Sequence, residues 1–246
     1  MLDIPIKNPS KVEPTPSSSN AVLRTKIRCT QLSLSLPLHP DDLPKFRGAI
    51  AAHAGHQNEL FHNHDNVKGG LHYRYPLIQY QVVDGKATVV GIAEGAEALR
   101  DWAETYEGRL QMDGQWHSAP ILAQDSEVVE VGFTENFQTY RIENWIALNE
   151  SKYQQWKQCP RMTDQIALFE KAIVGQVMSF ARGIDWFLEQ RLAAELLEIS
   201  EPRWRKRSGT KLMVFDATIR LPITLPNGIG IGKGASLGFG RIVNSF

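Results

Sequence analysis

The chain has 246 residues, with 42% hydrophobic and 22% charged content, and its 27 basic side chains balance 27 acidic ones. This length can bury one large core or two medium ones, and zero net charge excludes a polyanion binder that is basic all over. We expect a cytoplasmic protein without a membrane partner, because no apolar run approaches a membrane span and no signal-peptide core begins the chain. The two cysteines, Cys29 and Cys159, fit no disulfide or metal pattern and are expected to be free thiols.

The first half of the chain shows alternating and helical patterns separated by turn residues. Residues 1–20 are rich in Pro and Ser and predict a flexible tail. After it we expect a strand over 24–36 and a helix that ends near Gly55. Strands over 71–83 and 87–92 should form a hairpin that turns at Asp84-Gly85. A helix over 93–106, a hairpin at Asp113-Gly114 and a strand over 126–133 are expected next.

In the second half the expected elements begin the same order again. Its expected elements are a strand over 137–148, a helix over 163–181 and strands over 187–199 and 211–221, with a helix as the open alternative for 187–199. The order strand, helix, strand, strand, helix, strand is that of the ferredoxin-like fold. We therefore predict an α+β protein of two tandem ferredoxin-like (RRM-like) domains, over 21–134 and 135–246.

Histidines are concentrated in the window 53–75 of the first domain, which holds five of the seven in the chain. His62 and His64 stand two residues apart beside Asp65. Imidazoles titrate near neutral pH, so this pair could supply a general base and a general acid for one phosphodiester. Lys68, Tyr73 and Arg74 could stabilise the charge that develops. The alternatives are an exposed polar loop and a metal site, although the match to a His-x-His-x-Asp metal motif is poor.

A glycine-rich segment, NGIGIGKGASLGFGR, covers residues 227–241. Glycines allow close backbone approach, and successive N–H groups can form an anion nest. The segment is neither a Walker loop nor a dinucleotide fingerprint, because the required following residues are missing. We expect a polyanion site here, and an elaborate hairpin loop is the alternative. Its candidate binding residues are Gly232, Lys233, Gly234 and Ser236.

A basic run with one aromatic residue occupies positions 203–207, RWRKR, and Lys211 follows it. Cations that neutralise phosphates and a ring that stacks on bases suit RNA binding, and a solvated hairpin tip is equally compatible. The candidates are Arg205, Lys206 and Arg207. Lys45 and Arg47 on the first helix are weaker candidates, because charges on a helix surface usually serve solubility.

Three blocks together resemble a known family: LFHNH at 60–64, YRYPLIQYQVVDGKATVVGIAEGAE from residue 73, and GIGIGKGASLGFGRI near the C-terminus. The chain is similar to the CRISPR-associated endoribonucleases of the repeat-associated (RAMP) superfamily, which cut repeat RNA into guide RNAs. The subgroup with paired histidines is the nearest in pattern. This resemblance covers most of residues 24–246.

The resemblance implies RNA cleavage by the ribose 2′-hydroxyl, without a metal or another cofactor. It implies His62 and His64 as the acid–base pair and Tyr73 as a helper tyrosine, with Tyr75 left open. The helper lysine would be Lys45 or Lys68. Lys233 and its glycines would hold the RNA between the two halves, with Arg74 and the basic run as further contacts.

The partner implied by the resemblance is CRISPR repeat RNA. Subunits of a CRISPR effector complex and a second copy of the chain are compatible with it. The rival functions are a non-catalytic RNA-binding subunit of such a complex and a metal-dependent phosphohydrolase.

Overall fold

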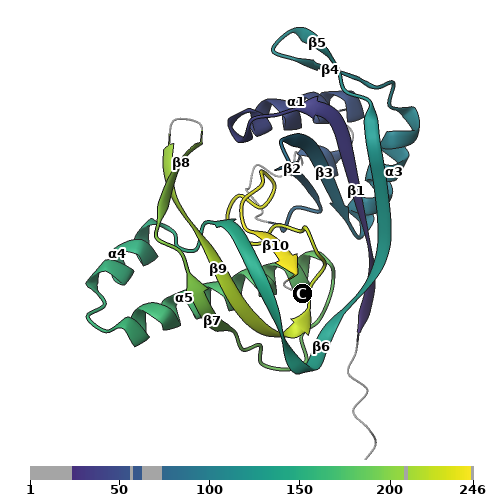
Figure 1. Ribbon diagram of the computed structural model, residues 1–246. Coiled ribbons are helices and arrows are strands. Elements are labelled where there is room, and N and C mark those ends of the chain that lie inside the picture. The colour runs from purple at the N-terminus through teal and green to yellow at the C-terminus, as the bar shows by residue number, and fades with distance from the viewer. Residues whose placement is uncertain (1–23, 56–57, 63–73, 208–209, 245–246) are drawn as a thin grey trace, which may run out of the picture.

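A computed structural model describes residues 24–55, 58–62, 74–207 and 210–244. The tail expected at 1–20 lies outside these residues. Two halves follow one another along the chain, and both build on antiparallel sheets (Figure 1).

The first half is a four-stranded antiparallel sheet in the order β2-β3-β1-β6, which is the ferredoxin-like order. Its elements are β1 (Thr25–Pro37), the 3-10 turn η1 (Pro40–Asp42), α1 (Leu43–Ala54), α2 (Glu59–His62), β2 (Ile78–Val83), β3 (Lys86–Ile92), α3 (Glu94–Thr105) and β6 (Ile121–Trp145). Helices α1 and α3 pack on one face of the sheet, where Phe46 and Leu99 meet Leu34 and Tyr80 in a single core. The predicted order and the hairpin turn at Asp84-Gly85 are confirmed.

The second half repeats the sheet order as β10-β6-β9-β7. Its elements are α4 (Glu150–Gln158), α5 (Met162–Gly183), β7 (Glu195–Ile199), β8 (Arg203–Arg207), β9 (Thr210–Thr224) and β10 (Arg241–Asn244). Helix α5 covers this sheet with Ile173, Val177 and Phe180. A glycine-rich loop over residues 225–240 stands where a second ferredoxin helix would lie, and it runs between the two halves (Figure 1).

Strand β6 belongs to both halves, which differs from the two separate strands expected over 126–133 and 137–148. Its first part pairs with β1 and its second part with β9, so one strand of 25 residues joins the sheets. The register breaks between Phe133 and Gln138, which is a bulge that bends the strand without ending it. The domain boundary expected near residue 135 falls inside this bend.

Other differences from the predicted elements have local causes. Helix α4 was not expected, because it buries no side chain and shows no apolar stripe. Residues 187–194 have no regular structure, so the predicted strand begins only at Glu195 and the helical alternative is wrong. The hairpin at Asp113-Gly114 joins β4 (Arg109–Met112) and β5 (Gln115–Ser118), a separate ribbon beyond the sheet.

Among the helices of the described ranges, none combines the length and the apolar character needed to cross a membrane.

Candidate nucleic-acid interface

The glycine-rich loop packs on the polar face of the first sheet. The Gly230 N–H donates to Gln79 Oε1 at 2.6 Å, and Gln79 Nε2 donates back to the Gly230 carbonyl at 3.2 Å. The Gln81 side chain donates to the Gly228 carbonyl at 2.7 Å. Both glutamines are buried, so their side-chain amides satisfy peptide groups of the loop that would otherwise lack a partner on this side.

The same loop covers the outer edge of β2. The Tyr80 N–H donates to the Ser236 carbonyl at 3.1 Å, and Tyr80 forms a parallel bridge with Leu237. An edge strand with unpaired backbone groups invites association, and here the loop fills that position. The loop therefore connects the two halves, which the sequence pattern did not show.

The predicted loop residues divide into packing and exposed positions. Gly232 and Gly234 both have φ of +80°, and a Cβ on Gly232 would collide with the Gln176 side chain of α5. Ser236 is only 9% exposed, so its environment is that of the interior. Lys233 is exposed between the two glycines, which makes it the cation that this loop presents to solvent.

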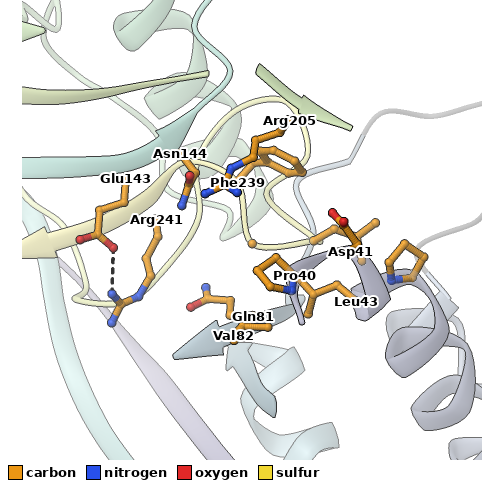
Figure 2. A pocket seen from close by; sticks show the side chains of 13 residues that line it. Pro40, Asp41, Leu43, Gln81, Val82, Glu143, Asn144, Arg205, Phe239 and Arg241 are labelled. Atoms are coloured by element: carbon orange, nitrogen blue, oxygen red, sulfur yellow. Dashed lines mark hydrogen bonds and ion pairs between the residues drawn. The ribbon is translucent and has the colours of Figure 1, made fainter. Parts of the chain in front are cut away.

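A pocket of about 300 Å³ opens beside this loop, between the halves (Figure 2). The first half contributes the start of α1 and the end of β2, and the second half contributes β6, β8, the loop and Arg241. Its lining residues are Pro40, Asp41, Leu43, Pro44, Gln81, Val82, Glu143, Asn144, Arg205, Leu237, Gly238, Phe239 and Arg241. Gln81 and Val82 lie across the pocket from Asn144 and Arg205 in Figure 2.

Two arginines and two carboxylates line the pocket, namely Arg205, Arg241, Asp41 and Glu143. Arg241 donates to Glu143 at 3.1 Å, and Arg203 and Arg141 lie 2.6 and 3.8 Å from the carboxylate of Asp216. Arg141, Arg203 and Asp216 are outside the lining, so the formal charges of the residues that line the pocket cancel.

The basic run lies on β8, which forms an antiparallel hairpin with β9. Arg205 lines the pocket, and the Trp204 side chain is 60% exposed. The backbones of Lys206 and Arg207 continue the strand, opposite Lys211 and Thr210. The run is therefore a hairpin arm, and Arg205 connects it to the pocket.

His62 ends the short helix α2, next to the C-terminus of α1. Its Nε2 lies 3.4 Å from the Gly55 carbonyl, and since a carbonyl only accepts, this contact places the ring proton on Nε2. The carbonyl of Phe61, the preceding residue, accepts from the Tyr80 hydroxyl at 3.1 Å. Tyr80 thus contacts α2 through its hydroxyl and the glycine-rich loop through its backbone.

Several predicted catalytic residues fall outside the described residues, namely His64, Lys68 and Tyr73. Arg74, the first residue after that gap, is exposed. No group of three or more His, Cys, Asp or Glu side chains that could hold a metal occurs in the described part of the chain.

Lys45 is not brought beside His62. It lies in the first turn of α1, whereas His62 contacts the carbonyl that follows the last turn, about 15 Å away along the helix axis. Its ammonium pairs instead with Asp113 at 2.8 Å and Asp42 at 3.2 Å. Hydrogen bonds to Asp113 and then Asp42 raise the pKa of Lys45. In this conformation Lys45 is therefore separated from His62, and its role as the helper lysine stays a prediction.

Tyr75, the alternative helper tyrosine, is a core residue. Its hydroxyl donates to the Gly230 carbonyl at 2.8 Å and accepts from Gln79 Nε2 at 3.0 Å. The ring packs edge-on against Phe180 of α5. Burial raises the pKa of Tyr75, which favours the neutral phenol in this position. Tyr75 thus stabilises the contact between the halves, and both hydrogen bonds of its hydroxyl are made inside the protein.

The pocket includes residues that the sequence analysis did not select. Gln81 occurs in a strand that reads as an ordinary buried β-strand, and Asn144 lies inside a second one. Only Arg241 carried a signal, as the basic end of the glycine-rich segment. No local pattern in the sequence brings these three residues together.

Two tandem ferredoxin-like halves, with a glycine-rich loop in place of the last helix of the second, define the class as RAMP-type proteins. Family models give the particular member of that class. The Cas6b N-terminal domain matches residues 25–127, and the Cas6b C-terminal domain matches residues 132–245. The chain belongs to the Cas6b family.

Relatives and solved structures agree with this assignment. An uncharacterized protein of Methanocaldococcus jannaschii is 36% identical over 115 residues, which cover 46% of this chain and 77% of the relative. A crystal structure of Cas6b covers 90% of this chain and 100% of its own, with 21% identity and a TM-score of 0.76. A CRISPR RNA processing endoribonuclease Cas6b gives the same coverage, 18% identity and a TM-score of 0.67. At these identities the two structures show the shared fold.

Proposed function

We propose that this chain cuts CRISPR repeat RNA into guide RNAs by a metal-independent transesterification. The observation that carries the proposal is membership of the Cas6b family over both halves of the chain. The pocket between those halves supports it, because a strand that lies there would contact elements of both.

The reaction needs two proton transfers and no external nucleophile. A general base removes the proton of the 2′-hydroxyl, and the oxygen attacks the adjacent phosphorus. The bond to the 5′-oxygen breaks, and a general acid protonates that leaving oxygen. The products carry a 2′,3′-cyclic phosphate and a 5′-hydroxyl. We assign the two proton transfers to His62 and His64, each of which would contribute about 10²–10⁴-fold in rate.

Charge stabilisation in this proposal comes from the residues that follow the histidines. Tyr73 would donate a hydrogen bond to the phosphorane oxygens, and Lys68 would provide the positive charge. Lys68 is preferred because Lys45 is paired with carboxylates at the other end of α1. The RNA would contact Lys233 on the glycine-rich loop and Arg205 at the pocket, with Arg74, Lys206 and Arg207 as further cations.

Incubation with repeat RNA, with and without EDTA, tests the reaction type. We expect cleavage that survives EDTA and disappears in the His62→Ala/His64→Ala double variant, while binding of the RNA persists. His117→Ala, in the β4–β5 ribbon, is the matched histidine control and should cut normally. RNA with a single deoxynucleotide before the cut should resist cleavage, since it lacks the nucleophile.

The rival functions predict different results in the same assay. A non-catalytic RNA-binding subunit would bind repeat RNA and leave it intact. A metal-dependent phosphohydrolase would lose activity in EDTA and would also cut the deoxynucleotide substrate. Association with effector subunits or with a second copy of the chain, and a cytoplasmic location, stay predictions.

A further inference from the structure

Three side chains that line the pocket each hold a buried polar atom without a hydrogen-bond partner among the described residues. These atoms are Gln81 Oε1, Asn144 Oδ1 and Arg241 Nε. Buried polar groups in native proteins are nearly always hydrogen-bonded, so each exception calls for an explanation. The three exceptions come from separate elements and share one pocket. A ligand with matching polar groups would satisfy them.

The surrounding contacts hold these groups in place. Gln81 is 1% exposed, and its Nε2 is occupied by the Gly228 carbonyl at 2.7 Å, which identifies Oε1 as the unpaired atom. The Arg241 guanidinium is held through its Nη1 by Glu143 at 3.1 Å. The final torsion of asparagine is broad, so the Asn144 amide can turn toward a ligand at little cost, whereas the Gly228 carbonyl holds the Gln81 amide in its orientation.

Asn144 reaches the pocket because β6 bulges there. The register between β6 and β9 breaks between Ile142 and Trp145, and Asn144 adopts φ of +49°. Its backbone N–H donates to Asp216 Oδ1 at 2.9 Å, and its carbonyl accepts from the Gly240 N–H at 3.2 Å. Bulges redirect side chains and are frequent next to functional sites. The bulge here gives the Asn144 side chain to the pocket.

Two unpaired acceptors and one unpaired donor define the complementary ligand. It must offer two N–H donors and one acceptor along an edge. Adenine and cytosine offer them as an amino group beside a ring acceptor, and guanine also carries N–H donors and an acceptor on one edge. Uracil presents only one N–H donor on its edge and leaves one amide unpaired. Apolar side chains of Pro40, Leu237 and Phe239 provide surface for the faces of a ring. The volume of about 300 Å³ is at the small end of ligand sites and suits a single base.

We propose that this pocket binds one unpaired, amino-bearing nucleobase of the RNA, turned out of the strand. The inference rests on the proposed RNA-processing function. Proteins read single-stranded RNA by placing splayed bases against apolar or aromatic side chains and by hydrogen-bonding their edges. Gln81, Asn144 and Arg241 are the reading groups, and the exposed Arg205 contacts the adjoining phosphate. The pocket thus selects against uracil at one position of the repeat.

Asn144→Gly is the informative variant. Glycine accepts φ of +49° without strain and keeps both backbone hydrogen bonds, so only the amide that faces the base is lost. Asp185→Gly is the matched control, because Asp185 is exposed, has φ of +53° and follows α5 outside the pocket. The two variants change the same kind of backbone position.

Binding is measured by titrating the full chain into labelled repeat RNAs in which each unpaired nucleotide is replaced in turn by uridine. We expect one amino-bearing position at which uridine raises Kd by about 5- to 150-fold, the range of a good amide–base pair. In Asn144→Gly this discrimination should fall to within about twofold, and in Asp185→Gly it should be retained. If adenine occupies the position, purine riboside, which lacks only the amino group, should behave like uridine.

The results separate this inference from the function on which it rests. Normal binding and cleavage with no uridine-sensitive position would overturn the base pocket alone. A sensitive position that Asn144→Gly leaves unchanged would overturn it as well. A chain that neither binds nor cuts repeat RNA would overturn both proposals.

Discussion

Gln79 and Gly230 hydrogen-bond to each other in both directions, across 151 positions of sequence. The Gln79 side chain is buried, and its amide satisfies both the N–H and the carbonyl of Gly230. The contact fixes the glycine-rich loop on the first sheet. The pocket between the halves depends on it, since the loop forms one wall.

Gln79→Ala should lower the free energy of unfolding by about 1–3 kcal/mol, because the buried Gly230 N–H loses its partner, while the Gly230 carbonyl keeps the Tyr75 hydroxyl. Urea unfolding of the full chain, followed by circular dichroism, measures the change. Gln111→Ala is the control, since Gln111 is exposed and its contact with the Gly114 carbonyl faces solvent. We expect the control to stay within about 0.5 kcal/mol of the parent. A loss below about 1 kcal/mol in Gln79→Ala would contradict the role of this contact.

Gly240→Ala should destabilise the chain more than Gly85→Ala. Both glycines have positive φ, +68° and +73°, so both substitutions impose backbone strain of about 1–3 kcal/mol. A Cβ at Gly240 would also collide with the Ile231 carbonyl, whereas the space around Gly85 is open. The difference in unfolding free energy between the two variants measures the crowding inside the loop. Equal losses would show that the loop relaxes without cost.

Stability should fall at alkaline pH. Burial, and then the nearby Glu127 carboxylate, raise the pKa of Cys29 to about 12, and burial raises the pKa of Tyr75 and Tyr80. Because thiols titrate near 8.5 and phenols near 10 when unfolded, the unfolded chain releases these protons first. The free energy of unfolding is therefore insensitive to these groups below about pH 8 and decreases between about pH 9 and 12.

Urea midpoints measured from pH 7.5 to about 10.5 test this slope. Cys29→Ala should make the decline shallower, because one of the titrating groups is removed. An unchanged slope in Cys29→Ala would remove Cys29 from the groups responsible for the decline. A flat profile over this range in the parent chain would show that these groups titrate alike in both states.

Lys233→Ala should weaken RNA binding in a manner that depends on salt. Each phosphate neutralised on a single strand contributes about −0.7 to the slope of log K against log salt. We expect the slope of log K against log salt to be less negative by about that amount in the variant. RNA titrations at several salt concentrations measure this slope. Lys157→Ala is the control, because Lys157 sits over the Tyr153 ring on α4, away from the loop (Figure 1). An unchanged slope for Lys233→Ala would remove Lys233 from the RNA contacts.

The element order and the family could be predicted because their signals are local. Alternation in β1, the Asp84-Gly85 turn and the long apolar period of α5 each depend on neighbours a few residues apart. The glycine spacing in 227–241 likewise reflects local backbone needs, such as the positive φ at Gly232 and Gly240.

The roles of individual residues could not be predicted in the same way. Lys45 seemed close to the histidines in sequence, yet α1 places it about 15 Å away along the axis. Tyr75 seemed equivalent to Tyr73, yet its ring is sealed between the glycine-rich loop and α5. Short separation along a chain does not give proximity once a helix or a buried strand intervenes.

The sequence by itself determined two ferredoxin-like patterns, a histidine-rich window and a glycine-rich segment. Periodicity and backbone preference depend on residues that are close together in the sequence, so these features could be predicted from it. Only the tertiary structure decided that the glycine-rich segment joins the halves and that Gln81, Asn144 and Arg241 line one pocket. The physical reason is that their partners lie on different strands, more than 60 residues apart between Gln81 and Asn144. Packing of the whole chain brings the side-chain amides of Gln79 and Gln81 to the peptide groups of Gly230 and Gly228. No local pattern in the sequence encodes these contacts.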